Sequence, residues 1–212
     1  MKLEGFSVGM MGTNCYLLIS GQGRAVLVDP GDEGEKIVRL LRSRGVEPGY
    51  LLLTHGHFDH VSGVAAVKEA FPQAQVLLHP DDLPFLERPE ACYSSLGEVA
   101  RRFSPPRQVD GFLSGGQELS LDDIRLKVLH TPGHSPGSVT FQGEDFLLTG
   151  DTLFAGGIGR CDLYGGSLEK IERSLAGLAA LKGDWRVYPG HGPSTTLDRE
   201  RRENPYLSNV GC

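Results

Sequence analysis

The chain has 212 residues, of which 39% are apolar and 23% are charged, and its net charge is −6. This composition is typical of a soluble globular protein, and the length predicts a single domain over residues 1–212. The acidic balance argues against a nucleic-acid partner, because contacts with a phosphate backbone need an excess of Lys and Arg. No apolar run approaches the roughly 20 residues of a membrane span, so we expect no membrane partner.

The N-terminus and the cysteines indicate a cytoplasmic protein. Residues 1–5 contain no apolar core of a secretion signal. Cys15, Cys92, Cys161 and Cys212 are scattered and lack the paired spacing of a metal site. We therefore expect free thiols in a reducing cytoplasm.

Short apolar runs between Gly- and Pro-rich turns predict a succession of strands and helices. The expected strands cover residues 3–9, 14–19, 25–28, 50–53, 75–78, 117–121, 124–129, 139–141, 146–148 and 186–188. The expected helices cover residues 33–44, 61–71, 93–103, 167–181 and 196–206. Ile37, Val38, Leu40 and Leu41 would form the buried face of the first helix. Ser167 would cap the fourth.

Residues 83–115 interrupt this regularity. Pro84, Pro89, Pro105 and Pro106 break the pattern, and the segment is long for a connection. Long connections often serve as lids or binding loops. We expect a lid insertion over residues 83–115 that faces the substrate.

The densest polar cluster directly follows the apolar run over residues 50–53. Residues 54–60 read Thr-His-Gly-His-Phe-Asp-His. Because residues two apart in an extended segment project to the same side, His55 and His57 can face one metal ion. Asp59 and His60 lie in the following turn and suit a second ion close by. Imidazole and carboxylate ligands suit zinc, iron(II) or manganese.

Other chemical groups also stand where strands end. Asp151 follows the strand over 146–148, and His191 follows the strand over 186–188. His130 and His134 are four residues apart, but the Pro and Gly between them exclude the helical arrangement of a zinc protease. We expect one of these two histidines to face the metal and the other to support the loop.

Two further polar residues leave more than one interpretation open. Asp29, at the end of the strand over 25–28, would either hydrogen-bond to a ligand histidine or form a simple Asp-Pro-Gly turn. His79 stands alone beside a proline at the start of a predicted helix, which favours a structural role.

Seven side chains at strand ends are too many for one zinc ion, which takes about four ligands. They suit two divalent ions that share a bridging carboxylate and a bridging water, each with an exchangeable position typical of a catalytic site. The expected ligands are His55, His57, Asp59, His60, His134, Asp151 and His191.

Arg160 lies in the Gly-rich segment 156–162, shortly after Asp151. The segment lacks the Lys-Ser/Thr ending of a phosphate-binding loop. We expect Arg160 to reach over the metals and bind an anionic part of the substrate, such as a carboxylate. The alternative is a structural salt bridge to Asp162.

The order of these motifs resembles the metallo-β-lactamase superfamily. The matching motifs are His55-x-His57-x-Asp59-His60, His134 in Pro-Gly-His-Ser, Asp151 in Gly-Asp-Thr-Leu-Phe and His191 in Pro-Gly-His-Gly. The resemblance implies an α/β fold, a four-layer αβ/βα sandwich of two mixed sheets with flanking helices. It assigns His55, His57 and His134 to the first ion, Asp59, His60 and His191 to the second, and Asp151 to both.

Within the superfamily the chain resembles the short bacterial glyoxalase II-like enzymes, the hydroxyacylglutathione hydrolases. The motifs that carry this resemblance are Thr13-Asn14-Cys15-Tyr16, Val28-Asp29-Pro30-Gly31, Gly157-x-Gly159-Arg160 and Arg202-Glu203-Asn204-Pro205. Two departures leave the substrate open. The chain is too short for the helical C-terminal domain of the full-length enzymes, and Asp162 stands where those enzymes have an aromatic residue.

The resemblance implies hydrolysis of a glutathione-type thioester, such as S-lactoylglutathione. We expect a metal-bridging hydroxide to attack the carbonyl carbon, and Asp59 to accept a proton as the catalytic residue as well as bind the second ion. The expected cofactors are two divalent ions, zinc first and iron or manganese as alternatives, in a monomer or homodimer. The main alternative comes from Arg160-Cys161-Asp162-Leu163, which resembles the related persulfide dioxygenases. That resemblance implies one iron ion held by His55, His134 and Asp151. A lactonase and a nuclease rank below these two.

Overall fold

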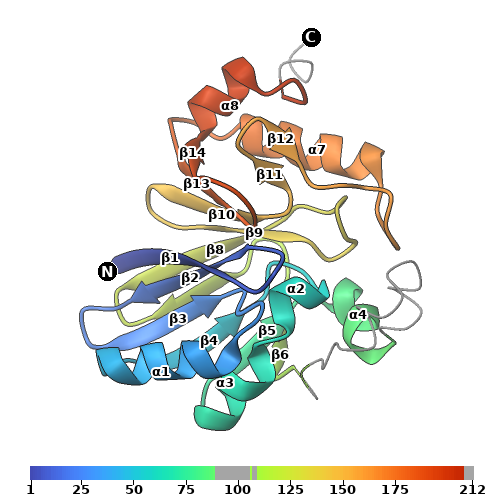
Figure 1. Cartoon of the computed structure of the whole chain (residues 1–212). Coiled ribbons are helices and arrows are strands. Elements are labelled where there is room, and N and C mark those ends of the chain that lie inside the picture. Colours follow the sequence, from blue (N-terminus) through green and yellow to red (C-terminus); the bar gives the residue numbers. More distant parts are fainter. Residues whose placement is uncertain (89–105, 107–108, 208–212) are drawn as a thin grey trace.

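Two mixed β-sheets lie face to face, with helices on both outer sides (Figure 1). The computed structural model describes residues 1–88, 106 and 109–207. Its layers are those of the αβ/βα sandwich expected from the sequence, so the predicted fold class is confirmed.

The first sheet has the strand order β1-β2-β3-β4-β5-β6 among the described residues. Its strands are β1 (Lys2–Val8), β2 (Thr13–Ile19), β3 (Arg24–Val28), β4 (Glu47–Leu52), β5 (Gln75–Leu78) and β6 (Gly111–Phe112). The strands from β1 to β3 pair antiparallel, and those from β3 to β6 pair parallel. The parallel connections carry α1 (Gly34–Arg44), α2 (Phe58–Val61) and α3 (Val64–Ala70).

The second sheet has the order β14-β13-β10-β9-β8-β7 in the same part of the chain. Its strands are β7 (Glu118–Leu121), β8 (Ile124–His130), β9 (Val139–Gln142), β10 (Phe146–Gly150), β13 (Arg186–Pro189) and β14 (Thr195–Thr196). A small hairpin of β11 (Leu153–Phe154) and β12 (Gly157–Ile158) follows β10. The outer helices are α7 (Leu168–Ala179) and α8 (Leu197–Glu203).

The alternation of side chains along each strand separates the apolar cores. On β2, Cys15 and Leu17 pack towards α1 and α3, whereas Tyr16 and Leu18 face the second sheet. This is the two-residue period of a strand buried on both faces. A third cluster joins the outer face of the second sheet to α7 and α8. The core between the sheets therefore fixes the relative position of every loop at the sandwich edge.

Local signals explain most of the predicted elements. The Ser167 side chain accepts a hydrogen bond from the backbone N–H of Lys170, so the predicted N-cap of α7 is confirmed. Leu40, expected to face inward, is only half-buried. The single helix expected over 61–71 is instead α2 and α3, separated at Gly63. A Cβ on Gly63 would lie 2.6 Å from the Pro30 carbonyl oxygen, so the chain bends where it packs against that turn.

The predicted lid over 83–115 is described only in part. The 3₁₀ helix η1 (Pro80–Asp82) precedes it, α4 (Leu83–Glu87) forms its first residues, and β6 lies near its end. The helix expected over 93–103 lies outside the described residues, as do Cys92 and Cys212. None of the helices in the described ranges is long and apolar enough to cross a membrane.

The core between the sheets predicts a large effect for one leucine. Leu126 is 2% exposed on β8 and belongs to that core, whereas Leu168 is 55% exposed at the start of α7. We expect Leu126→Ala to lower the free energy of unfolding by about 2–5 kcal/mol, through lost burial and a cavity. Leu168→Ala should change it by no more than about 0.5 kcal/mol. Urea unfolding followed by circular dichroism measures both, and equal losses would contradict this placement of the core.

Candidate metal centre

The site forms at one edge of the sandwich, where strands of both sheets end. The segment after β4 carries His55 and His57 and continues into α2, which holds Asp59 and His60. In the second sheet, the loops after β8, β10 and β13 carry His134, Asp151 and His191. Ligand sites of α/β proteins commonly occupy the carboxyl ends of strands.

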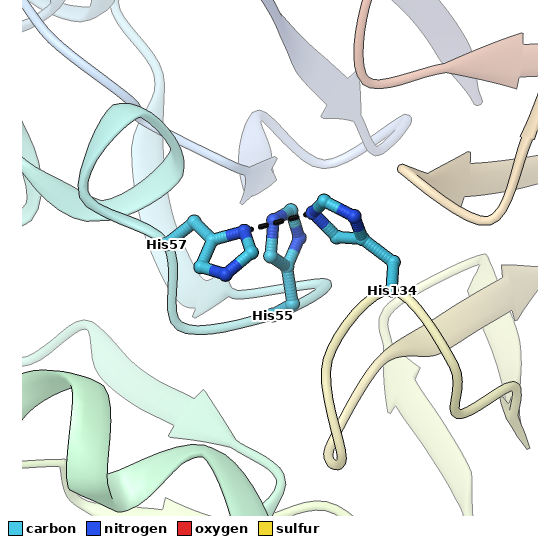
Figure 2. Close-up of side chains that lie close together, drawn as sticks. All are labelled: His55, His57 and His134. Atoms are coloured by element: carbon cyan, nitrogen blue, oxygen red, sulfur yellow. Dashed lines mark hydrogen bonds between the residues drawn. The ribbon is translucent and has the colours of Figure 1, made fainter. Parts of the chain in front are cut away.

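The first cluster consists of His55, His57 and His134, all buried. Figure 2 shows the rings of His55, His57 and His134 gathered together, with those of His57 and His134 pointing towards each other. His57 Nδ1 lies 2.8 Å from His134 Nε2. One ligand atom from each of the three lies within 4.8 Å of the other two.

The second cluster consists of Asp59, His60 and His191. His191 Nε2 lies 3.1 Å from Asp59 Oδ2, and His60 Nε2 lies 3.6 Å from the same oxygen. The nitrogens His60 Nε2 and His191 Nε2 are 3.4 Å apart. This cluster is less enclosed than the first, because the His191 side chain is 26% exposed.

Asp151 lies between the two clusters. Its Oδ2 is 3.5 Å from His134 Nε2 in the first cluster and 3.6 Å from His191 Nε2 in the second. Its Oδ1 is 3.4 Å from His60 Nε2. The structure thus brings together all seven residues predicted as ligands, with one carboxylate in contact with both groups.

The donor set suits divalent cations. His55 Nε2 is buried and has no hydrogen-bond partner among the described residues, which is costly unless a ligand such as a metal ion uses it. Burial and the neighbouring imidazoles His60 and His57 hold the pKa of His55 well below its ordinary value. Burial, with His134 close by, lowers the pKa of His57 to about 3. Neutral imidazoles are the form that binds metal.

The second cluster attracts positive charge. Burial alone would lower the pKa of His60, but Asp59, Asp151 and Asp29 outweigh it and raise that pKa well above its ordinary value. Burial would likewise raise the pKa of Asp59, but His60 and His191 outweigh it and lower that pKa. The carboxylates therefore stay ionised and favour a protonated imidazole. A bound metal cation would supply this positive charge in place of the proton.

Comparison with known proteins identifies the family. The profile of the metallo-beta-lactamase superfamily matches residues 8–191, most of the chain and all seven residues. The chain belongs to the metallo-beta-lactamase superfamily. Members of this superfamily bind divalent metal ions, and the histidine and aspartate groups of this chain could hold such ions.

Relatives in this superfamily match the chain over nearly its whole length. It is 34% identical to the hydroxyacylglutathione hydrolase GloC of Haemophilus influenzae, over 99% of each chain. The crystal structure of TTHA1623 in a di-iron-bound form superposes with a TM-score of 0.85 at 41% identity, covering 96% of this chain and 100% of that one. The structure of the B3 metallo-beta-lactamase BLEG-1 gives 0.90 at 35% identity, covering 98% and 100%. The resemblance to the short glyoxalase II-like type is thus confirmed.

In this metallo-beta-lactamase fold, Asp29 supports the second cluster. Its Oδ1 accepts a hydrogen bond from the Thr54 backbone N–H at 2.8 Å. Its Oδ2 accepts from Thr54 Oγ1 at 2.6 Å and lies 2.8 Å from His60 Nδ1. Of the two interpretations of Asp29, the hydrogen bond to a predicted ligand is confirmed, and it fixes the orientation of the His60 ring.

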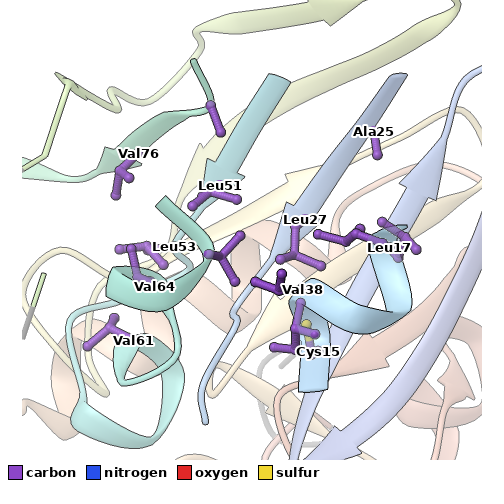
Figure 3. Packing of buried hydrophobic residues seen from close by; sticks show 14 of the residues in the cluster. Cys15, Leu17, Ala25, Leu27, Val38, Leu51, Leu53, Val61, Val64 and Val76 are labelled. Carbon is purple, nitrogen blue, oxygen red and sulfur yellow. The ribbon is translucent and has the colours of Figure 1, made fainter. Parts of the chain in front are cut away.

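An apolar cluster anchors the segment that carries His55 and His57. Leu51 and Leu53 on either side of the strand end pack with Val61 and Val64 beneath the helices (Figure 3). The polar segment 54–60 lies between Leu53 and Val61, and the burial of both residues fixes its position relative to the sheet. The hydrophobic core consequently determines the position of the backbone that carries His55 and His57.

Several supporting residues were missed in the sequence. Thr13 Oγ1 donates to Asp59 Oδ2 at 3.1 Å. Asn14 Nδ2 donates to the carbonyl oxygens of Pro189 and Gly192, and the Tyr16 hydroxyl donates to Pro189 O. The Thr13–Tyr16 motif thus ties β2 to the loop of His191. Its only signal was the resemblance to glyoxalase II-like enzymes, which gave these residues no role.

His130 and His79 have the structural roles expected for them. His130 Nε2 donates to Pro136 O at 3.0 Å and supports the loop of His134. The rings of His130 and His79 stack 4.2 Å apart at an interplanar angle of 9°. Asp81 lies near them, but parallel stacked rings direct their lone pairs side by side and do not converge on one ion.

Arg160 shows the alternative contact that its sequence left open. Its guanidinium makes two hydrogen bonds of 2.7 Å with the Asp162 carboxylate, and both side chains are exposed. Its backbone carbonyl accepts a hydrogen bond from His134 Nδ1 at 2.8 Å. The residue therefore lies beside the first cluster, and its backbone orients the His134 ring.

Proposed function

We propose that the chain is a dinuclear metal-dependent hydrolase that cleaves a glutathione-type thioester. The single observation that carries this proposal is the position of Asp151, whose carboxylate contacts one histidine cluster through His134 and the other through His60 and His191. A carboxylate in that position suits a bridge between two ions. One ion alone would leave part of this buried polar set unpaired.

The ligand assignment follows the two clusters. His55, His57 and His134 would hold the first ion, Asp59, His60 and His191 the second, and Asp151 both. We propose zinc, because these ligands give the nitrogen and oxygen donors that zinc accepts. Iron or manganese uses the same donors, and TTHA1623 supports iron as an alternative.

The chemistry divides between the ions and the side chains. When bound, divalent ions lower the pKa of a water molecule and polarise a carbonyl oxygen. The ionised Asp59 carboxylate, held by Thr13, accepts a proton from the attacking water. The thiolate of a thioester leaves without a general acid. Burial and the nearby Asp162 raise the pKa of Cys161, which argues against this thiol as the nucleophile.

The thioester substrate rests on similarity together with the site. The name of GloC describes hydrolysis of a hydroxyacyl thioester of glutathione, and that of BLEG-1 hydrolysis of a lactam. Both reactions attack a carbonyl carbon, which is the chemistry that this donor set supports. The Thr13–Tyr16 motif, which resembles the glyoxalase II-like group, contacts both Asp59 and the loop of His191. We therefore favour S-lactoylglutathione over a lactam or lactone.

The metal number is tested by removing a predicted ligand of the second ion. Purified wild type with metal in excess should contain about two equivalents of zinc per chain. His191→Ala should contain about one, because the first cluster keeps its three imidazoles. Glu169→Ala, which removes an exposed carboxylate outside both clusters, is the control and should keep two. Elemental analysis after gel filtration gives these numbers, and a wild type that never exceeds one equivalent would refute the dinuclear site.

The reaction is tested by thiol release under nitrogen. Zinc- or manganese-loaded enzyme should release glutathione from S-lactoylglutathione without oxygen. Asp59→Ala should lower kcat by at least about 100-fold, because it removes both the proposed proton acceptor and a proposed ligand of the second ion. Asp81→Ala, an exposed carboxylate outside the clusters, should retain activity. Silence under nitrogen, with oxygen uptake on glutathione persulfide by the iron form, would favour the dioxygenase.

The role of Arg160 is tested by separating KM from kcat. We propose that its exposed guanidinium exchanges Asp162 for an anionic group of the substrate, such as a glycine carboxylate. Arg160→Ala should then raise KM about tenfold and leave kcat within about twofold, as expected when uniform binding is lost. Arg173→Ala, which breaks another exposed ion pair with Glu169, should change neither. An unchanged KM in Arg160→Ala would leave only the salt bridge with Asp162.

A further inference from the structure

One buried carboxylate connects the two loops that supply the first histidine cluster. Asp82 has an exposed fraction of 0% and ends the 3₁₀ helix η1 (Pro80–Asp82) after β5. Its Oδ2 accepts hydrogen bonds from the Gly56 backbone N–H at 2.8 Å and from Ser135 Oγ at 2.6 Å. Its Oδ1 accepts from the Gly137 backbone N–H at 2.6 Å.

These donors belong to different halves of the sandwich. Gly56 separates His55 and His57 in the segment after β4 of the first sheet. Ser135 and Gly137 follow His134 in the loop between β8 and β9 of the second sheet. One carboxylate therefore binds directly to the backbone on both sides of the contact between His57 and His134.

The two loops fit closely against Asp82. A Cβ on Gly137 would lie 2.8 Å from Asp82 Cγ, and a Cβ on Gly56 would lie 2.9 Å from the Asp82 carbonyl oxygen. Both distances are shorter than ordinary Cβ contacts, so glycine is needed at each position. Phe85, three residues further on, places its ring edge-on to His57 at 4.8 Å between centroids. The same short segment thus supports the backbone and a side chain of the cluster.

The arrangement is not one that stability alone favours. A buried carboxylate loses its hydration, and neutral or backbone donors offset only part of that cost. In agreement, burial raises the pKa of Asp82 to about 6 despite the hydrogen bonds from Ser135, Gly56 and Gly137. An apolar side chain would avoid this cost but would remove the carboxylate acceptor of the Gly56 and Gly137 N–H groups. The contacts themselves are what Asp82 supplies.

We propose that Asp82 is a positioning residue that holds the His55–His57 segment and the His134 loop at the separation needed to bind one cation. This inference rests on the proposed ligand set, and it does not depend on the thioester substrate. Asp82 acts through two backbone segments and touches none of the proposed ligand side chains directly through its carboxylate. Residues that orient ligands in this way typically change metal affinity or activity 10–100-fold when they are replaced.

Asp82→Asn tests the proposal with little change in shape. An amide has one acceptor oxygen, so in either orientation its NH₂ group faces a backbone N–H, of Gly137 or of Gly56. Asp81→Asn is the matched control, because it makes the same chemical change at the adjacent residue, whose side chain is 57% exposed. Cobalt(II) binding to the metal-free variants is measured by competition with a chelator, together with the visible absorption of the bound cobalt.

We expect Asp82→Asn to bind the tighter cobalt ion about 10–100-fold more weakly and to show an altered cobalt spectrum. Asp81→Asn should stay within about twofold of wild type. Near-ultraviolet circular dichroism of the metal-free proteins tests whether Asp82→Asn keeps the wild-type fold. Wild-type affinity and spectrum in folded Asp82→Asn would overturn the proposal, whatever its free energy of unfolding, because Asp82 would then be a structural contact only.

If Asp82→Asn does not fold, Ser135→Ala decides. It removes one of the donors to Asp82 and keeps the carboxylate, and we expect about a threefold to tenfold loss of cobalt affinity with an altered spectrum. Unchanged binding in Ser135→Ala would overturn the proposal in that case. Wild type that binds cobalt but leaves S-lactoylglutathione intact would contradict the thioester reaction alone. Wild type that binds no cobalt would contradict the ligand set on which both proposals rest.

Discussion

The close packing of five imidazoles and two carboxylates, most of them buried, is the constraint on which the rest of this structure depends. Side chains of this kind lose hydration when they leave water, and the loss is offset only by partners of the opposite character. Here the pKa values move apart: burial lowers that of His55, while carboxylates raise that of His60. Most of its imidazoles are therefore neutral, and they bring little positive charge to the two ionised carboxylates. A divalent cation supplies what the protein alone does not.

The sandwich provides the rigidity that such a cluster needs. Strands of both sheets end at the same edge, and the core between the sheets keeps these ends in register. Close backbone contacts complete the arrangement: a Cβ on Gly31 would lie 1.8 Å from the Asp59 carbonyl oxygen, and a Cβ on Gly159 would lie 1.9 Å from that of Asp151. The glycines beside the site therefore reflect loops packed backbone against backbone.

Short-range patterns in the sequence predicted most of the fold and the donor set, because both depend on neighbouring residues. The spacing of His55, His57, Asp59 and His60 after an apolar strand is local, and so is the cap at Ser167. The contacts of Asp82 and Asn14 are not, since their partners lie 26–55 and 175–178 residues away along the chain. Pro-Asp-Asp-Leu indicates only the start of a helix, and nothing in it indicates a buried carboxylate. The break between α2 and α3 likewise depends on the distant turn at Pro30.

Asp29 and Asp82 divide the support of the site in a way that follows from their contacts. Asp29 binds a side chain of the second cluster, His60, so it orients a ring and adds negative charge beside it. Asp82 binds backbone N–H groups on both sides of the first cluster, so it sets the distance between the His55–His57 segment and the His134 loop. Its carboxylate does not orient the histidine rings. The ring of His134 is oriented instead by the Arg160 carbonyl. Orientation and separation are thus controlled by different residues. A change in one affects ring geometry, while a change in the other affects the spacing of whole segments.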